Sequence, residues 1–122
     1  MLLRKEMSTI HIGGYEFRWT EHAYERAFER YTHPYLMNDV LGQALETMLE
    51  IPKNDFVFRD FISHGSFTLA RDRYGRNIFW VITFGWVREM YPRAGDTVIQ
   101  RAKDGQFSTF EWIDKGKILE TA

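Results

Sequence analysis

Cysteine is absent from the 122-residue sequence. Its absence excludes a disulfide-stapled fold, a thiol nucleophile, a thioredoxin-like motif and a zinc site with cysteine ligands. A chain without cysteine also fits a reducing compartment, and we expect a cytoplasmic protein. Proline is scarce as well, with three residues. No linker rich in proline or serine and no internal repeat is visible, which favours a single compact domain.

Long apolar runs are also missing from the sequence. No window approaches the roughly 18 apolar residues of a membrane-spanning helix. Residues 1–3 are apolar, but positions 4–6 are all charged, so the beginning of the chain lacks the apolar core of a secretory signal peptide. We therefore expect neither a secretion signal nor a membrane partner.

Several sequence motifs of catalytic and metal sites are absent. No two of the four histidines show the His-x-x-x-His or His-Glu-x-x-His spacing of zinc sites. The sequence contains no Gly-x-Ser-x-Gly elbow, no phosphate-binding Walker loop and no Gly-x-Gly-x-x-Gly. No local motif therefore supports a serine hydrolase, a nucleotide triphosphatase or a dinucleotide-binding enzyme. We expect no metal and no cofactor.

The composition is that of a globular domain with many aromatic residues. Hydrophobic residues make up 44% of the chain and charged residues 27%, and a chain of this length should bury about two-thirds of its surface on folding. Aromatic residues reach 16%, enough to ask whether some of them form a binding surface. The net charge of -1 argues against a general polycation that coats nucleic acid.

The charge is unevenly distributed along the chain. Residues 1–52 hold five basic and eight acidic residues, whereas residues 53–103 hold nine basic and five acidic ones. Most of the basic residues in the middle segment are arginines, whose planar guanidinium suits phosphate groups. This favours a phosphate-bearing partner; a solvated sheet face with cross-strand ion pairs explains the pattern equally well. The arginines are Arg59, Arg71, Arg73, Arg76, Arg88, Arg93 and Arg101.

The first third of the chain predicts a hairpin followed by two helices. Residues 9–12 and 15–19 alternate polar and apolar side chains around Gly13-Gly14, as in a tight β-hairpin. Thr20 supplies an N-cap oxygen for a helix that runs to about residue 31. A second helical stripe covers residues 36–49, and Pro52 ends it.

The rest of the chain predicts strands. They are expected at residues 56–61, 66–72, 77–84, 87–91 and 97–102, separated by turn residues. Residues 78–82 are apolar at both odd and even positions, which predicts a central strand covered on both faces. We expect an α+β domain over residues 1–105, with a meandering antiparallel sheet of about four to five strands. Residues 106–122 are expected to form a terminal hairpin or arm, with strands at 107–113 and 118–120.

The first predicted helix carries its charges in separate rows. Within each row the neighbours at i,i+4 have like charge, which destabilises a helix by roughly 0.2 to 0.5 kcal/mol per pair. One interpretation is that the basic row lines a cleft against the sheet, with a histidine as general acid or base and arginines that stabilise phosphate charge. The other is a solvated helix face with local ion pairs. The rows are Glu21, Glu25 and Glu29, then His22, Arg26 and Arg30.

Residues 17–30 carry a resemblance to a known group of proteins. They resemble the opening of small prokaryotic domains whose first helix reads Ser/Thr-x-His-Ala-x-x-Arg-x-x-x-Arg, and those domains are similar to the RelE/BrnT-like toxin superfamily. The resemblance implies a second helix, a short antiparallel sheet and metal-independent ribonuclease activity, and the order of elements agrees through about residue 102. The matching positions are Thr20, His22, Ala23, Arg26 and Arg30.

Two turns supply further candidate residues. Tyr74 lies at a predicted hairpin tip between arginines, an arrangement that can stack a base while holding a phosphate; turn geometry and solubility explain such a tip equally well. His64 stands beside Gly65 in another turn. It is either a simple loop residue or a second candidate acid or base.

The sequence therefore leads to two hypotheses of different class. The first is a toxin-like, metal-independent domain that cleaves or binds RNA. The second is a non-enzymatic phage or mobile-element protein that binds and inhibits a protein partner. The partners would be RNA in the first case and an antitoxin or an inhibited host protein otherwise, and homo-oligomers stay open. The candidate catalytic residues are His22, Arg26, Arg30 and His64, and the candidate substrate-binding residues are Arg59, Arg71, Arg73, Tyr74 and Arg76.

Overall fold

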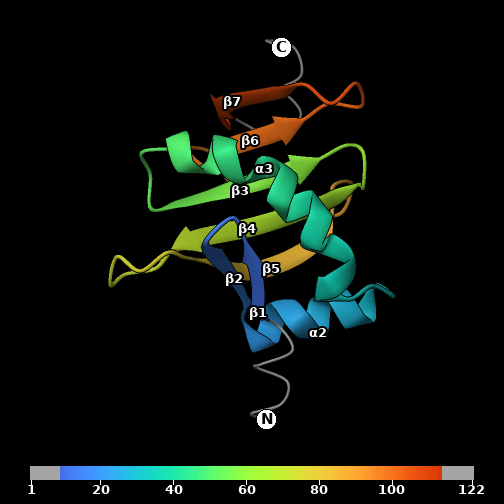
Figure 1. Cartoon of the computed structure of the whole chain (residues 1–122). Coiled ribbons are helices and arrows are strands. Elements are labelled where there is room, and N and C mark those ends of the chain that lie inside the picture. Colours follow the sequence, from blue (N-terminus) through green and yellow to red (C-terminus); the bar gives the residue numbers. More distant parts are fainter. Residues whose placement is uncertain (1–8, 114–122) are drawn as a thin grey trace.

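Two α-helices, one 3-10 helix and seven strands make up the computed structural model, which describes residues 9–113 (Figure 1). A hairpin comes first, then the helices, then the remaining strands; the predicted α+β class is confirmed, and the predicted order of elements is matched roughly. No helix within these residues is long and apolar enough to span a bilayer. In chain order the elements are β1 (Thr9–Ile12), β2 (Tyr15–Trp19), α2 (Glu21–Glu29), η1 (Pro34–Met37), α3 (Asn38–Glu50), β3 (Asp55–Asp60), β4 (Gly65–Arg71), β5 (Ile78–Trp86), β6 (Thr97–Arg101) and β7 (Phe107–Glu111).

The strands form one mixed sheet in the order β1-β2-β5-β4-β3-β6-β7. Strands β3, β4 and β5 are an antiparallel meander, as predicted. The prediction of a wholly antiparallel sheet of four to five strands is wrong, because β2 pairs with β5 and β6 pairs with β3 in parallel. The strand expected at residues 87–91 does not form. Residues 87–96 instead return the chain from the end of β5 to the start of β6, so β6 runs in the same direction as β3.

The end of the described chain belongs to the same sheet. Residues 107–111 form β7, which pairs antiparallel with β6 as an edge strand. These residues were expected in a terminal hairpin or arm. The second strand expected there, at 118–120, lies outside the described residues.

Both helices cover one face of the sheet. In Figure 1, α3 crosses in front of β3 and β4, and α2 runs beside the second half of β5. The sheet twists so strongly that β1 and β2 cross the direction of β6 and β7. Gly42 of α3 lies close to Ile12 of β1, since a Cβ there would be 3.2 Å from the Ile12 Cγ2 atom. The first hairpin therefore contacts α3.

The helix-covered face is filled with aromatic side chains. Leu41, Ala44 and Met48 of α3 are fully buried against it. Burial of this much apolar surface is the main stabilising contribution to such a domain. Six of the ten phenylalanines lie in this core, which accounts for part of the aromatic excess: Phe17, Phe56, Phe58, Phe67, Phe79 and Phe84.

A buried ion pair joins two parallel strands under α3. Asp60 of β3 and Arg101 of β6 are directly opposite in the register, and Arg101 Nε and Nη2 donate to the two Asp60 oxygens at 2.7 and 3.0 Å. Burial opposes ionisation of Asp60, but hydrogen bonds from Arg101 and Ser63 outweigh it and hold the pKa of Asp60 below its ordinary value. Arg101 also donates to Gln43 of α3. This pair fixes β6 beside β3.

Side chains cap the N-terminal end of α2 and the C-terminal end of α3. Thr20 Oγ1 accepts a hydrogen bond from the Ala23 amide at 3.1 Å and donates to the Ile82 carbonyl at 2.9 Å, which confirms the predicted N-cap. Arg71 caps the end of α3: its Nη2 donates to the carbonyls of Met48, at 2.9 Å, and Ile51. The Met48 carbonyl also accepts a hydrogen bond from the Ile51 amide at 3.2 Å. Because the last carbonyls of a helix lack the amide of a following turn, the guanidinium supplies additional donors to them.

Replacing Arg71 should therefore destabilise the fold. Arg71→Met keeps an apolar stem but removes the donors, and we expect the free energy of unfolding to fall by about 1 to 3 kcal/mol. Urea unfolding followed by tryptophan fluorescence measures this change. Arg73→Met removes an exposed arginine two residues away and is the matched control. Equal stability of the two variants would contradict the capping role.

Candidate functional site

The basic row of α2 is largely held in ion pairs. Arg26 Nη1 donates to the Glu29 carboxylate at 3.2 Å. Arg30 Nε donates to the carboxylate of Glu89, in the turn after β5, and this bond holds the pKa of Glu89 below its ordinary value. His22 is exposed in the first turn of the helix. The ion pairs that the sequence left open as an alternative are thus present for both arginines.

His64 lies at the same end of the sheet as Arg30. Its side chain is exposed, its backbone has the left-handed φ of 69°, and its carbonyl accepts a hydrogen bond from the Val87 amide at 2.8 Å. Glu89, the partner of Arg30, belongs to the same turn as Val87. The structure therefore brings His64 near the C-terminal end of α2. General acid or base catalysis by His22 or His64 stays a prediction.

Four of the five candidate substrate-binding residues lie elsewhere, whereas Arg59 pairs with Ser66 near His64. Arg71 ends β4, whereas Gly65, beside His64, begins it. Seven residues of strand at about 3.3 Å each separate the two ends by about 20 Å. The candidate residues therefore form two groups at opposite ends of the β4–β5 hairpin. Arg71 itself is the helix cap described above.

Arg59 is buried within a group of rings on the sheet face opposite the helices. Its side-chain Cζ lies 5.1 Å from the ring centre of Trp112 and 5.3 Å from that of Tyr91, and Nη2 donates to the Val87 carbonyl at 2.5 Å. Burial lowers the pKa of the Arg59 guanidinium. Arg59 is only 5% exposed, so it anchors the 87–96 loop instead of facing a ligand.

The turn between β4 and β5 is organised around the Asp72 carboxylate, whose side chain is 2% exposed. It accepts hydrogen bonds from Arg76 Nε and Nη2 at 2.8 and 2.9 Å, from the amides of Tyr74 and Arg76, both at 3.2 Å, and from Trp80 Nε1 at 3.3 Å. The Arg76 hydrogen bonds, with those from Trp80 and the backbone, hold the pKa of Asp72 well below its ordinary value. One carboxylate thus fixes a turn, a guanidinium and an indole.

Two aromatic rings lie beside guanidinium groups around this carboxylate. The Arg76 Cζ atom is 5.6 Å from the ring centre of Tyr74, which is 75% exposed. The Arg18 Cζ atom, from β2, is 5.7 Å from the ring of the half-buried Trp80. Such cation–π contacts hold both groups in place. We call this arrangement the hairpin platform; its members are Arg18, Asp72, Arg73, Tyr74, Arg76 and Trp80.

The sequence predicts part of this platform. Arg73, Tyr74 and Arg76 were expected to bind substrate, and the structure brings them together at one turn. Trp80 and Arg18 were missed, because Trp80 was interpreted as part of a strand covered on both faces. Arg18 is opposite Trp80 only through the parallel pairing of β2 with β5, which no local pattern reveals. The alternation along β5 was the signal that could have found Trp80: its neighbours Phe79 and Val81 point to one face of the sheet, so the indole points to the other.

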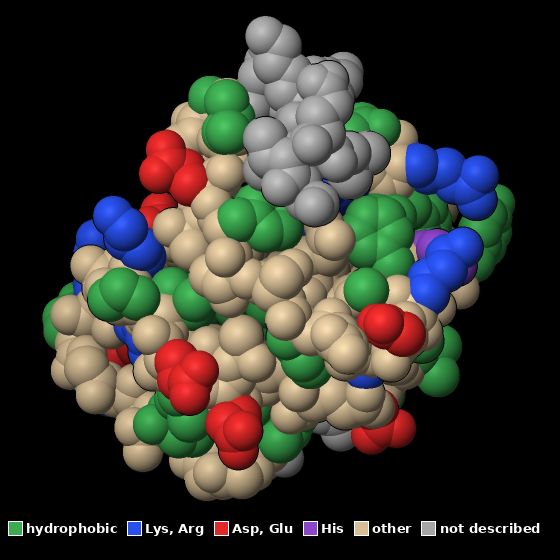
Figure 2. Space-filling model, turned by 90° about the horizontal axis from the view of Figure 1, so that it is seen from above, with side chains coloured by type: hydrophobic (Ala, Val, Ile, Leu, Met, Phe, Trp, Pro, Cys, Tyr) green, Lys and Arg blue, Asp and Glu red, His purple; other side chains and the backbone are tan. Residues whose placement is uncertain are grey.

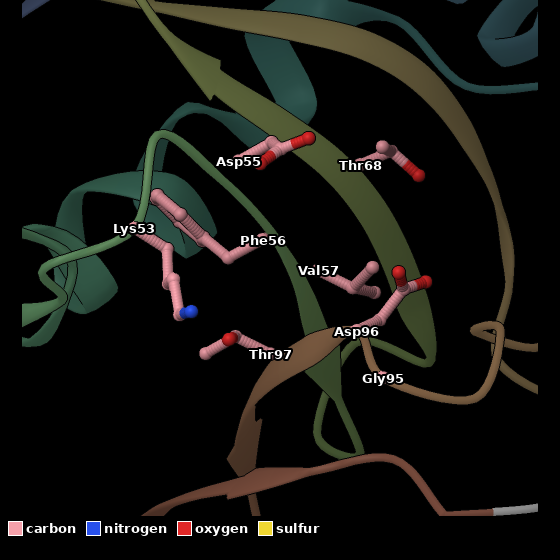
Figure 3. A pocket seen from close by; sticks show the side chains of 8 residues that line it. All are labelled: Lys53, Asp55, Phe56, Val57, Thr68, Gly95, Asp96 and Thr97. Atoms are coloured by element: carbon pink, nitrogen blue, oxygen red, sulfur yellow. The ribbon is translucent and has the colours of Figure 1, made fainter.

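A pocket of about 210 Å³ lies beside the platform on the same face of the sheet. Figure 3 shows the carboxylates of Asp55 and Asp96 approaching from two sides, with Thr68 across from Asp55. Trp80 pairs with Ala70, and Ala70 pairs with Asp55, so the pocket begins two strands away from the indole. Lys53, Val57 and Thr97 also line it. No sequence pattern predicts this pocket.

The basic side chains do not form one continuous surface in the view of Figure 2. That view shows Lys and Arg side chains in separate groups at opposite sides, with Asp and Glu side chains between them. Within residues 9–113, no group of three or more His, Asp or Glu side chains could hold a metal ion. The site is thus built from local arginine–aromatic contacts.

Comparisons of the chain with family models, with curated proteins and with solved structures found no match.

The depressed pKa of Asp72 predicts a pH dependence of stability. The ionised carboxylate stabilises the folded state above the ordinary aspartate pKa of about 3.9, and this contribution is lost as the pH falls toward the lower pKa of the folded state. We expect Asp72→Asn to lose stability at pH 6 and to show a shallower decline between pH 5 and pH 3 than the wild type. Urea unfolding at stepped pH measures both effects. Asp104→Asn, in the exposed β6–β7 turn, is the control, and parallel curves for wild type and Asp72→Asn would refute the assignment.

Proposed function

We propose that this chain binds single-stranded RNA through the hairpin platform, without a metal or cofactor. The observation that carries the proposal is the exposed Tyr74 ring, held against the Arg76 guanidinium by the buried Asp72 carboxylate. An aromatic ring beside fixed arginines is the pairing that single-strand binders use for bases and phosphates.

The platform supplies both parts of such an interaction. A base stacked on an aromatic side chain contributes about 1 to 3 kcal/mol, and Tyr74 presents most of its ring to solvent. Arg73 is exposed in the same turn and would contact a phosphate. Because Asp72 already fixes Arg76 and Trp80, little side-chain freedom is lost on binding.

Single-stranded RNA fits this surface better than a duplex does. Stacking on Tyr74 requires a base that is not already stacked within a helix. Duplex binding rests instead on many phosphate contacts. The net charge of -1 and the separate basic groups on the face shown in Figure 2 do not favour such contacts. The proposal concerns binding and requires no cleavage by His22 or His64.

Replacing the exposed ring should weaken RNA binding. For Tyr74→Ala we expect the affinity for a labelled 12-nucleotide single-stranded RNA to fall about tenfold, because the loss of one stacking contact is worth about 1 to 3 kcal/mol. Fluorescence anisotropy at fixed, low salt measures it. Tyr35→Ala removes another tyrosine that is 59% exposed, on η1, and is the control. Equal loss in both variants, or no binding by the wild type, would refute the platform.

Capture of a protein partner is a second candidate function, favoured by an exposed apolar surface. Phe28, Tyr31, Tyr35 and Leu36 are 59 to 97% exposed at the end of α2 and on η1. Tyr31 has a φ of 59°, which is rare for a bulky residue. Large exposed aromatic side chains of this kind are typical of interface anchors. In Figure 1, α2 ends on the right and the β4–β5 turn lies on the left, so the two surfaces are separate.

Removing this surface should release a bound protein. We expect the wild type to retain one protein of a bacterial host in defined ratio, and Phe28→Ser/Tyr31→Ser to lose it, with an affinity at least about tenfold lower. Co-purification followed by titration calorimetry with the recovered protein measures this. Tyr74→Ala should retain the same protein. Retention by the double variant would exclude this surface.

A further inference from the structure

We propose that the pocket beside the platform binds the amino group of a nucleobase and so makes the RNA binding selective for cytosine and adenine over uracil. The inference rests on the proposed function and specifies its substrate. It depends on three observations: the position of the pocket, the hydrogen-bonding character of its walls and the way those walls are held.

The pocket lies where a bound strand would continue. Trp80, Ala70 and Asp55 are partners across three neighbouring strands and point to the same face. Neighbouring strands are about 4.8 Å apart, so Asp55 is about 10 Å from Trp80 across the face. Stacked bases follow one another at about 3.4 Å along a strand. A strand of about four nucleotides therefore reaches from the platform to the pocket.

Two carboxylates make part of the pocket lining rich in hydrogen-bond acceptors. Asp55 and Asp96 place two carboxylates around the space, and Thr68 contributes a hydroxyl group (Figure 3). An ionised carboxylate only accepts hydrogen bonds. Cytosine and adenine each present an exocyclic amino group that donates two hydrogens, and aspartate pairs with the cytosine amine in protein–nucleic acid complexes. Uracil presents a carbonyl oxygen at the equivalent position, which would face the carboxylates without a hydrogen bond.

The Asp96 wall is held before any ligand binds. Asp96 Oδ2 accepts a hydrogen bond from the Arg93 amide at 2.8 Å, which fixes the carboxylate and leaves its second oxygen for a ligand. Val57 is 6% exposed and offers an apolar contact for the ring of the base. Lys53 extends along the rim toward Thr97 in Figure 3. Its ammonium group would neutralise the phosphate of the nucleotide whose base enters the pocket.

The test measures the affinity of the full chain for three RNA probes. Anisotropy with 12-nucleotide oligo(C), oligo(A) and oligo(U) at equal salt should show about tenfold tighter binding of oligo(C) and oligo(A) than of oligo(U). Asp55→Ala/Asp96→Asn should bring the three affinities to within about twofold and leave oligo(U) binding no weaker, because the removed charges repel phosphate. Asn at 96 keeps an oxygen for the Arg93 amide.

Two controls separate the outcomes. Asp104→Asn removes an exposed acidic charge from the β6–β7 turn and should keep the preference. Tyr74→Ala should weaken all three probes by the same factor. Binding of all three probes with equal affinity, or a preference that survives Asp55→Ala/Asp96→Asn, would overturn the pocket assignment and leave the platform standing. No binding of any probe would refute the proposed function, and the pocket assignment with it.

Discussion

Burial of one aromatic face under α3 is the constraint on which the rest of the structure depends. The face takes side chains from β2, β3, β4, β5 and β6, and α3 closes it with Leu41, Ala44 and Met48. A sheet buried on one face leaves the other for polar and half-buried side chains. The same alternation that points Phe79 into the core therefore points Trp80 to the opposite face, so packing on one side determines which residues lie on the other.

The local features of the fold could be predicted, and the non-local ones could not. The hairpin around Gly13-Gly14 and the Thr20 cap depend on neighbouring residues, and both are present. The parallel pairing of β2 with β5 joins segments about sixty residues apart. The local hydrophobic periodicity of the sequence does not predict such a pairing. Residues 87–91 looked like a strand, but Met90 packs onto Gly85, where a Cβ would lie 2.8 Å from its sulfur. The Glu89 and Met90 amides donate to the Trp86 carbonyl at 3.0 and 3.1 Å, so the chain turns out of the sheet there.

The candidate site, too, could be predicted only in part, because the type of a residue does not show whether it is buried. The arginines of the middle segment suggested phosphate, yet Arg71 caps a helix and Arg101 neutralises Asp60. Guanidinium groups bind carbonyls, carboxylates and aromatic rings as readily as they bind phosphates. The hairpin tip could be predicted because its residues are consecutive. The pocket could not, since Asp55 and Asp96 meet only through the pairing of β3 and β6.

The 87–96 loop crosses the sheet without a helix, yet it is fastened near its start by Arg30 through Glu89 and further along by Arg59 against Tyr91. A crossover of this kind is usually the part of a fold that reorganises when a ligand arrives. In this structure, contacts formed within the fold already restrict the movement of the loop. Asp96, at the end of the loop, is held by hydrogen bonds of its own: its carbonyl accepts from the Trp112 amide and its carboxylate from the Arg93 amide, both at 2.8 Å. Two arginines that are distant from Asp96 in the sequence, Arg30 and Arg59, thereby help to hold the loop on which Asp96 lies.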